Sequence, residues 1–346
     1  MKYINLFDTQ AEYDEAQKYY PNVSYIEATD EVVYQETDPG PDYSKEYLTF
    51  EALESGTFSY RSNYQQVQYS IDGGDSWLTL ASNTQTPTIN QGEKISWKAS
   101  VGSYWITFDS TGRFNAEGNI MSLIYSDDFE NKTSFPDVQT KLDNVFKGNS
   151  NIISAENLML PATTLTANCY ENMFNGCTSL TTAPELPATT LTNYCYGSNN
   201  SESGMFRGCT SLTTAPELPA TTLGIYCYCH MFYGCTSLTT APELPATTLT
   251  IQCYMQMFFG CTSLTTAPEL PATTLTYNCY NQMFGYCSSL NYIKMLATDI
   301  SATNCLNNWV KGVQTTSGTF TKAASMSTLP TGDSGIPANW TVVDIN

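Results

Sequence analysis

The sequence has 346 residues, 41% of them hydrophobic, so it is long enough for two or three domains and too apolar for a disordered chain. It carries 14 basic and 33 acidic residues, and the formal net charge of −19 excludes proteins that bind nucleic-acid phosphates through basic surfaces. No stretch approaches the roughly 18 consecutive apolar residues of a membrane span, so the sequence predicts no membrane insertion.

The first 43 residues predict a small α+β module. We expect a strand over residues 2–7, a helix over 9–19 capped by Asp8, and a hairpin with strands at 23–26 and 31–34. The run Asp38-Pro39-Gly40-Pro41-Asp42 predicts a linker that ends the module.

Residues 44–128 predict an all-β, immunoglobulin-like sandwich, because short runs rich in aromatic and β-branched residues alternate with turn residues. The run from Ser70 to Trp77 predicts a hairpin and matches, once, the Asp-box pattern of sialidase propeller blades. Asp72 and Asp75 are candidate calcium ligands, but the ligand series of an EF-hand is absent. The hairpin interpretation is therefore preferred to a metal site.

Internal repetition dominates the rest of the chain. The segment Cys-Thr-Ser-Leu-Thr-Thr-Ala-Pro-Glu-Leu-Pro-Ala-Thr-Thr-Leu occurs four times without a change, beginning at Cys177, Cys209, Cys235 and Cys261. From Pro161 to Pro271 the prolines that open Pro-Ala-Thr-Thr-Leu are spaced 26, 32, 26 and 26 residues apart. The longer interval holds a polar insertion, Gly197 to Gly204, which predicts a surface loop. A period of 26 lies within the roughly 20–29 residues of leucine-rich repeats, so residues 129–346 predict a solenoid with degenerate end turns.

Each period predicts two short strands and one helical turn. Leu180 to Leu186 and Ala188 to Leu191 are extended segments separated by Pro187. In Cys169-Tyr170-x-x-Met173-Phe174, apolar residues recur four positions apart, Cys169 with Met173 and Tyr170 with Phe174. This spacing predicts a helical turn that buries one side. Gly176 is the candidate C-cap that ends it. The last leucine of each repeat is expected to stack in the interior: Leu165, Leu191, Leu223, Leu249 and Leu275.

The pattern Met-Phe-x-Gly-Cys-x-x-Leu, followed by an extended segment, a proline and a second strand, resembles the BspA-type leucine-rich repeats of bacterial surface proteins. That family carries Ala-Phe-x-x-Cys-x-x-Leu at this place; here Met replaces the alanine, and Pro184 departs from the usual strand. The ending from Gly335 to Asp344 resembles the strand that closes such arrays, and the resemblance covers about residues 135–346. It implies a leucine-rich-repeat fold and a role in adhesion.

The N-terminal module resembles the N-terminal modules of head or tail appendage proteins from phages of gut bacteria. This resemblance implies attachment to other virion proteins through residues 1–43. The expected fold class is thus mainly β with short helical turns. Its expected parts are a small α+β N-terminal anchor (1–43), a β-sandwich spacer (44–128) and a leucine-rich-repeat solenoid with a C-terminal cap (129–346).

The cysteines occupy two fixed positions of the repeat. One set is Cys177, Cys209, Cys235, Cys261 and Cys287, and the other is Cys169, Cys195, Cys227, Cys253 and Cys279. Stacking would bring identical positions about 4.8 Å apart, so each set predicts a ladder of small buried thiols. The first residues show no apolar signal-peptide core, and we therefore expect a reducing cytoplasm and free thiols, with disulfides between the two positions as the alternative.

The residues that vary between otherwise identical repeats are the candidate ligand-binding surface. They are Asn168, Asn193, Tyr194, Ile225, Tyr226, Tyr233, Ile251, Gln252, Phe259, Tyr277 and Asn278. Stacking would set them in stripes, and exposed aromatics beside amides suit sugars, which stack on ring faces and bond to polar edges. The alternative is surface drift without selection.

The repeated glutamates Glu185, Glu217, Glu243 and Glu269 would also stack. We expect a solvated acidic stripe, because four buried like charges could not persist without protonation or a cation. Calcium bridging is the alternative.

The inventory of reactive residues argues against catalysis. The single histidine, His230, could pair with Cys227, Cys229 or Cys235 as a nucleophile, but an exposed histidine on a helical turn is the preferred interpretation. No second ligand pair stands at zinc spacing from Cys229, so we expect no metal, cofactor or catalytic residue.

The expected function is a non-enzymatic phage virion appendage, made in the host cytoplasm, that presents its repeats to a host cell-surface protein or glycan. A homo-oligomer, such as a trimer, is a further expected partner. The alternatives are a bacterial cell-surface adhesin of the BspA type, an architectural virion decoration that binds no host, and a glycan-cleaving enzyme, which would need a carboxylate pair at glycosidase separation.

Overall fold

The computed structural model describes residues 42–62, 66–99, 106–314, 316–326 and 329–345, and also the backbone of two strands nearer the N-terminus. The chain divides into two compact units, Met1–Asp42 and Tyr43–Asn346. The strand expected over 2–7, the helix expected over 9–19 and the linker expected over 38–41 lie outside the described residues.

In the first unit, β1 (Val23–Ala28) pairs antiparallel with β2 (Glu31–Glu36). The register joins Val23 to Glu36 and Ala28 to Glu31, so the two strands match along their whole length. This pairing confirms the hairpin expected from the sequence.

The second unit is mainly β, as expected. Among the described residues only η1 (Tyr43–Lys45) and α2 (Ser122–Tyr125) are helical. Its first strands are β3 (Leu48–Ala52), β4 (Phe58–Ser62), β5 (Val67–Ser70), β6 (Leu78–Leu80), β7 (Lys94–Ala99), β8 (Ile106–Ser110) and β9 (Phe114–Asn119). The antiparallel pair β5–β6 confirms the hairpin expected around Ser70 to Trp77.

These strands form two sheets that share an aromatic core. The larger sheet has the order β10-β9-β3-β7-β5-β6, in which β10 is Ile152–Ser154, and β4 pairs with β8 in a separate sheet. The Phe50 ring on β3 lies 5.4 Å from Phe58 on β4 and 5.1 Å from Phe108 on β8. Alternate residues of each strand thus meet across the space between the sheets, as the two-residue period of a strand requires.

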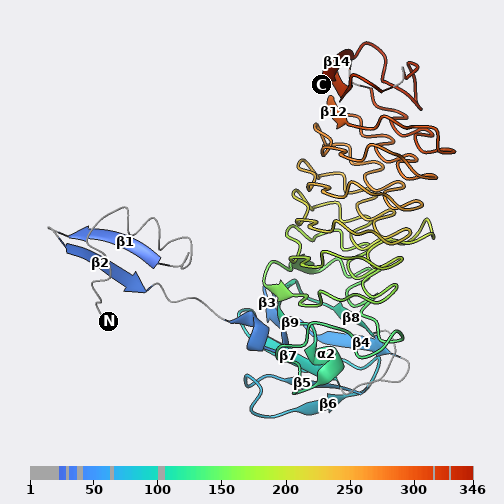
Figure 1. Cartoon of the computed structure of the whole chain (residues 1–346). Helices are drawn as coiled ribbons and strands as arrows, with labels where there is room; N and C mark the ends of the chain where they lie inside the picture. Colours follow the sequence, from blue (N-terminus) through green and yellow to red (C-terminus); the bar gives the residue numbers. More distant parts are fainter. Residues whose placement is uncertain are drawn as a thin grey trace. The chain divides into compact units, whose positions relative to one another are not determined.

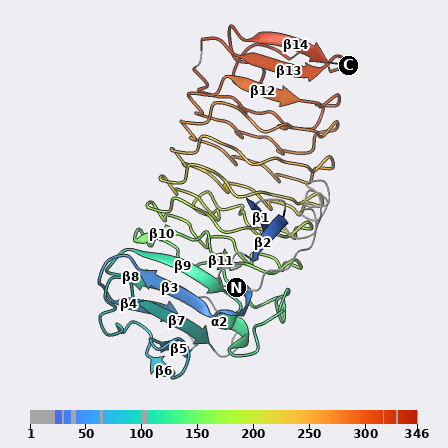
Figure 2. The same ribbon diagram turned by 90° about the vertical axis from the view of Figure 1, so that its left-hand side faces the viewer.

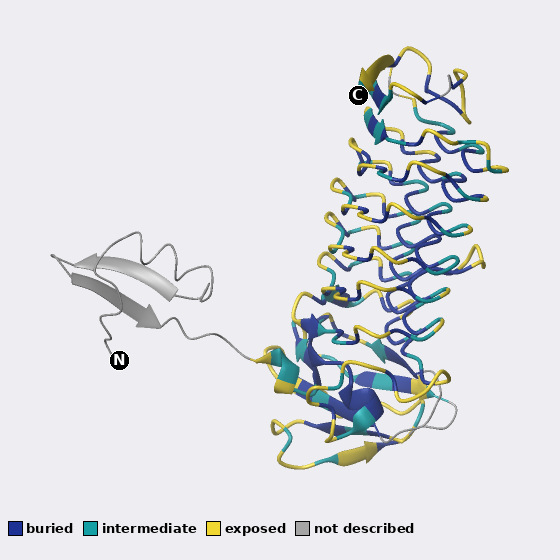
Figure 3. Cartoon of the chain, in the orientation of Figure 1, coloured by how far each residue is buried: buried dark blue, intermediate teal, exposed yellow. Residues whose placement is uncertain are grey.

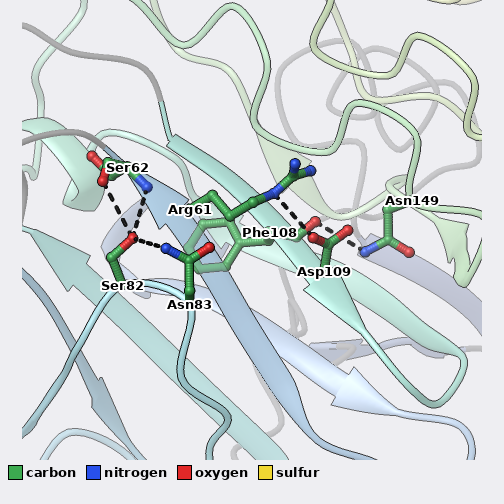
Figure 4. Close-up of polar contacts among 7 residues, drawn as sticks. All are labelled: Arg61, Ser62, Ser82, Asn83, Phe108, Asp109 and Asn149. Atoms are coloured by element: carbon green, nitrogen blue, oxygen red, sulfur yellow. Dashed lines mark hydrogen bonds and ion pairs between the residues drawn. The ribbon is translucent and has the colours of Figure 1, made fainter.

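The region expected to be a separate spacer continues into the repeats without a break. The strands β10 (Ile152–Ser154) and β11 (Leu158–Met159) pair parallel with β9, as Figure 2 shows. The Phe146 ring lies 5.7 Å from Phe50, and Asn149 Nδ2 donates to the Phe108 carbonyl oxygen at 3.2 Å (Figure 4). The expected boundary near residue 128 therefore falls inside one compact unit, because the first turns cover what would be an open edge of the sheet.

From Leu142 onward the chain winds in turns that stack along one direction; we call residues 142–345 the repeat array (Figure 1). Identical positions of successive turns meet through parallel bridges such as Thr164–Thr190, Thr190–Thr222 and Thr214–Thr240. The strands expected at 180–186 and 188–191 are reduced to such single bridges. Proline supplies no N–H donor, and Pro184 and Pro187 therefore limit the ladder to isolated pairs.

The expected helical turn is also different in the structure. In the turn from Tyr226 to Gly234, every fourth residue has a left-handed backbone, with φ of 57° at Tyr226, 59° at His230 and 72° at Gly234. Alternate N–H groups point to the next turn, as His230 N donates to the Met255 carbonyl oxygen at 3.0 Å. The N–H groups between them bond three residues back, which gives consecutive tight turns instead of an α-helix.

The array ends in the parallel strands β12 (Tyr292–Met295), β13 (Thr319–Ala323) and β14 (Thr341–Ile345). β14 includes Thr341 to Asp344, the last four residues of the segment that resembles a closing strand. Figure 3 shows that buried positions recur from turn to turn along the inside of the array. No helix in the described part of the chain is both long and apolar enough to cross a membrane.

Candidate ligand-binding edge

The residues that vary between repeats lie on one edge of the array, in the consecutive turns just described. We call this surface the turn edge; it comprises residues 142–148, 167–176, 193–208, 225–234, 251–260, 277–286 and 303–312. Beneath it every turn buries the same side chains, which explains why the interior does not vary. In one turn the buried residues are Cys227, Tyr228, Met231, Phe232 and Cys235.

Four of the candidate aromatic residues stack on one another. Tyr194 and Tyr226 have ring centroids 5.1 Å apart and nearly parallel rings, as do Tyr233 and Phe259 at 4.7 Å. Each of these rings therefore has one face covered by its neighbour. The expectation that the rings offer their faces to sugars is wrong for the covered faces. Tyr277 is the candidate aromatic that is most open, with 45% of its surface exposed.

The candidate amides serve the turns themselves. Asn168, Gln252 and Asn278 have φ of 62°, 55° and 54°, a left-handed conformation that asparagine tolerates better than most residues. Asn278 is buried and accepts a hydrogen bond from Asn281 Nδ2 at 3.0 Å, so its side chain is not open to a ligand. Asn193 Oδ1 accepts from the backbone N–H of Ile225 at 2.8 Å. Backbone geometry thus suits Asn168 and Asn278, although Tyr194 and Tyr226 hold the same left-handed position in other turns.

Of the remaining candidates, Ile225 is half-buried and Ile251 is 43% exposed. Ile225, Ile251 and Tyr277 occupy the same position of three successive turns, and Gln252 N donates to the Tyr277 carbonyl oxygen at 3.1 Å. The structure therefore brings these candidates together along the array.

A second line of residues follows the buried Phe of each turn, and two of its members, Tyr233 and Phe259, were candidates from the sequence. Each turn has one residue between the buried Phe (or its substitute) and a left-handed Gly, and we call this line the edge row. Its members are Lys147, Asn175, Arg207, Tyr233, Phe259, Tyr286 and Lys311; Asn175 is buried, and the others are exposed or half-buried. In the sixth of these turns the order is inverted to Gly285-Tyr286, so the aromatic residue takes the left-handed position, with φ of 58°.

All twelve cysteines are free and buried. The Cys177 thiol donates to the Phe146 carbonyl oxygen of the preceding turn at 3.0 Å, and the equivalent thiols of the other turns do the same. Burial raises the pKa of the Cys195 and Cys235 thiols to about 12, which keeps both protonated. These thiols are structural and unreactive, since thiolate is the reactive form.

His230 is buried, so its interpretation as an exposed histidine is wrong. The insertion covers it: His230 Nδ1 lies 3.2 Å from the Ser198 carbonyl oxygen and 3.2 Å from Cys229 Sγ, while Nε2 lies 2.9 Å from Gln256 Oε1. Burial lowers the pKa of His230 and raises that of Cys229 well above its usual value. Both groups are therefore neutral, and neither is open to a substrate.

The acidic candidates have local roles. Asp72 accepts hydrogen bonds from Ser70 and Ser76, which lower its pKa to about 2 and close the β5–β6 hairpin. Glu185, Glu217, Glu243 and Glu269 are exposed, which confirms the solvated stripe, and Glu269 pairs with Lys294 at 2.7 Å. Among the described residues, no three His, Cys, Asp or Glu side chains are grouped closely enough to hold a metal ion.

Comparison with protein-family models, with curated proteins and with solved structures found no match to this chain.

Proposed function

We propose that this chain is a non-enzymatic appendage protein of a phage virion that is anchored by its N-terminal unit and binds the host surface through its turn edge. Within it, residues 129–346 form a leucine-rich-repeat solenoid, and residues 44–128 form a β-sandwich at its base. The parallel bridges between identical positions support the solenoid, and the aromatic core between two sheets supports the sandwich.

The observation that carries the binding function is the contrast between a constant interior and a variable edge. The repeats keep the same buried Cys, Tyr, Met and Phe, yet the adjoining edge positions change from turn to turn. An architectural rod would need only the interior, whereas a binding surface needs different side chains at equivalent places.

A role without catalysis is supported by the Cys229–His230 pair, which is buried and neutral. The thiol is nucleophilic only as thiolate. Placement on a virion is supported by the resemblance of the first 43 residues to phage appendage modules, and by their separation from the second unit.

The test is to image intact phage particles from cultures of gut bacteria with a gold-labelled antibody against residues 161–300. The control is the same antibody absorbed beforehand with the purified protein. Gold on particle appendages is the expected result. Gold on the bacterial envelope and not on particles would replace the virion role with that of an adhesin.

A further inference from the structure

The edge row gathers cations that have no acidic partner. In the described part of the chain, Lys147, Arg207 and Lys311 form no ion pair with a carboxylate, whereas two other lysines of the array, Lys294 and Lys322, do. The whole chain carries a net charge of −19, so positive groups left unpaired and collected in one repeat position are unexpected.

The rings between these cations add to the positive character of the row. Arg207 Cζ lies 4.5 Å from the Tyr233 ring centroid, and Lys311 Nζ lies 5.9 Å from that of Tyr286. Tyr233 and Phe259 stack face to face, so their solvent-exposed parts are ring edges. Aromatic edges are the positive part of the ring quadrupole, and the faces are the negative part. The row therefore presents positive groups from Arg207 to Lys311.

The backbone holds the row rigidly in register. Gly176 N donates to the Arg207 carbonyl oxygen at 2.8 Å, and Gly208 N and Gly234 N donate in the same way to Tyr233 and Phe259. The Arg207 side chain is fixed as well, since its Nε donates to the Ser201 carbonyl oxygen of the insertion at 2.9 Å. A ligand would therefore meet groups that are already ordered, which lowers the entropic cost of binding.

Tyr286 is a surface aromatic at a left-handed backbone position. Six other turns place glycine at this left-handed position, with φ between 72° and 77°, where a residue with a Cβ is strained. A Cβ on Gly285 would lie 2.8 Å from the Phe259 ring, so the inverted order leaves room for that ring. Tyr286 is 45% exposed and tilted 62° from Phe259, and its ring lies against Gly312, where an added Cβ would come within 2.8 Å of it.

We propose that the edge row binds an anionic glycan, namely a polysaccharide that bears carboxylate groups. In this proposal Arg207 and Lys311 pair with the carboxylates, and a sugar ring stacks on Tyr286. The ring centroids of Tyr233 and Phe259 lie 4.7 Å apart, and those of Phe259 and Tyr286 lie 5.1 Å apart. This similar spacing over successive turns suits a polymer of like sugar units that lies along the array.

Toward the N-terminal end of the row, Lys147 and Arg61 line a hollow of about 510 Å³ together with Thr107 and Asn144. The Arg61 guanidinium, which is paired with Asp109 at 3.3 Å, is drawn in Figure 4. The hollow offers space for a further sugar unit of the bound polysaccharide. This inference rests on the proposed function, because it names the ligand class of the turn edge.

The test is affinity electrophoresis of the full chain through gels that contain polygalacturonate, hyaluronate or alginate, with methyl-esterified polygalacturonate and poly-L-glutamate as controls. We expect retardation by at least one of the three acidic polysaccharides, decreasing as salt is raised, and none by the ester or the polypeptide. Arg207→Gln and Lys311→Gln should each weaken retention about threefold. Tyr286→Gly should weaken it about three- to tenfold and, because it restores the usual glycine, should not lower the melting temperature.

The matched control is Lys294→Gln, which removes the same charge from the array outside the row and should leave retention unchanged. Retention by none of the three polymers, equal retention by the ester or polyglutamate, or no effect of the row variants would overturn the inference. Gold labelling of virions does not depend on glycan binding. Labelled particles without polysaccharide retention would therefore refute the ligand class and leave the proposed function standing.

Discussion

The Cys235 thiol donates a hydrogen bond to the carbonyl oxygen of Phe206, 3.1 Å away in the preceding turn. The same oxygen also accepts from the backbone N–H of Cys209 at 3.0 Å, so both of its lone pairs are used. Alanine would fit this space but would leave one lone pair without a donor. The contact gives a physical reason for cysteine at this repeat position beyond its small size.

Cys235→Ala should therefore lower the free energy of unfolding by about 1–2 kcal/mol, from a small cavity and a lost weak hydrogen bond. Urea denaturation monitored by circular dichroism would measure it. Cys305→Ala is the matched control and should cost less, because this thiol bonds to the Ile300 carbonyl oxygen within its own turn at 3.3 Å and joins no two turns. An equal cost at both sites would show that the contact between turns adds nothing.

Alkaline pH should destabilise the array steeply. Burial raises the pKa of Cys195, Cys235, Cys279 and Cys287 to about 12 from the ordinary 9.0. Above pH 9 the unfolded thiols lose protons that the folded ones keep, so stability present below pH 9 is lost as pH rises toward 12. Each thiol contributes about 1.4 kcal/mol per pH unit in this window. Melting temperatures measured from pH 8 to 11 would test this; a flat profile would contradict it.

The same burial should make the thiols slow to label. We expect little reaction of the native protein with a thiol reagent at pH 8, and reaction of all twelve cysteines after unfolding in denaturant without reductant. Mass spectrometry counts the labels. Fewer than twelve labels in the unfolded chain would mean that disulfides are present.

The leucine ladder should be a main source of stability. Leu223 and Leu249 are 7% and 6% exposed, and Leu→Ala at either should cost about 2–5 kcal/mol through the cavity that remains. Leu78→Ala is the matched control, since Leu78 is 54% exposed and its truncation should change stability by less than about 0.5 kcal/mol. Thermal melts of the three variants test the ladder. An unchanged melting temperature in Leu223→Ala would show that Leu223 does not belong to the core.

The single histidine should make stability depend on mild acid. Burial holds the pKa of His230 below its usual 6.5. As pH falls below 6.5, the histidine of the unfolded chain becomes protonated before that of the folded chain. The free energy of unfolding, which is highest above pH 6.5, therefore decreases. Because the chain has one histidine, its imidazole proton resonances identify the titration directly by NMR. A midpoint at or above 6.5 in the folded protein would refute the buried, neutral state.

Calcium should not stabilise the glutamate stripe. Glu217 and Glu243 are exposed to solvent, and no preorganised loop surrounds them. Melting temperatures measured with calcium, with magnesium and with a chelator at fixed ionic strength should be the same. A calcium-specific rise of several degrees, lost in Glu217→Gln, Glu243→Gln, would establish bridging in place of a solvated stripe.

The sequence by itself determined which side chains lie inside. A repeat of constant period places identical residues at identical depths, so the burial of Leu223, the cysteines and the Tyr and Phe ladders followed from spacing, as did the exposure of Glu217. Turn chemistry likewise determined the β5–β6 hairpin, because Asp72 and Ser70 close it through local hydrogen bonds.

Only the tertiary structure decided what the edge exposes. An α-helical turn and a run of consecutive tight turns both place like residues four positions apart. The hydrogen bonds to the next repeat favour the run of tight turns. Whether Tyr233 offers its face depends on Phe259 in the following turn, and whether His230 is exposed depends on the insertion that covers it. These contacts join residues 26 and 32 positions apart. Local sequence therefore cannot specify them, whereas stacking of the turns does.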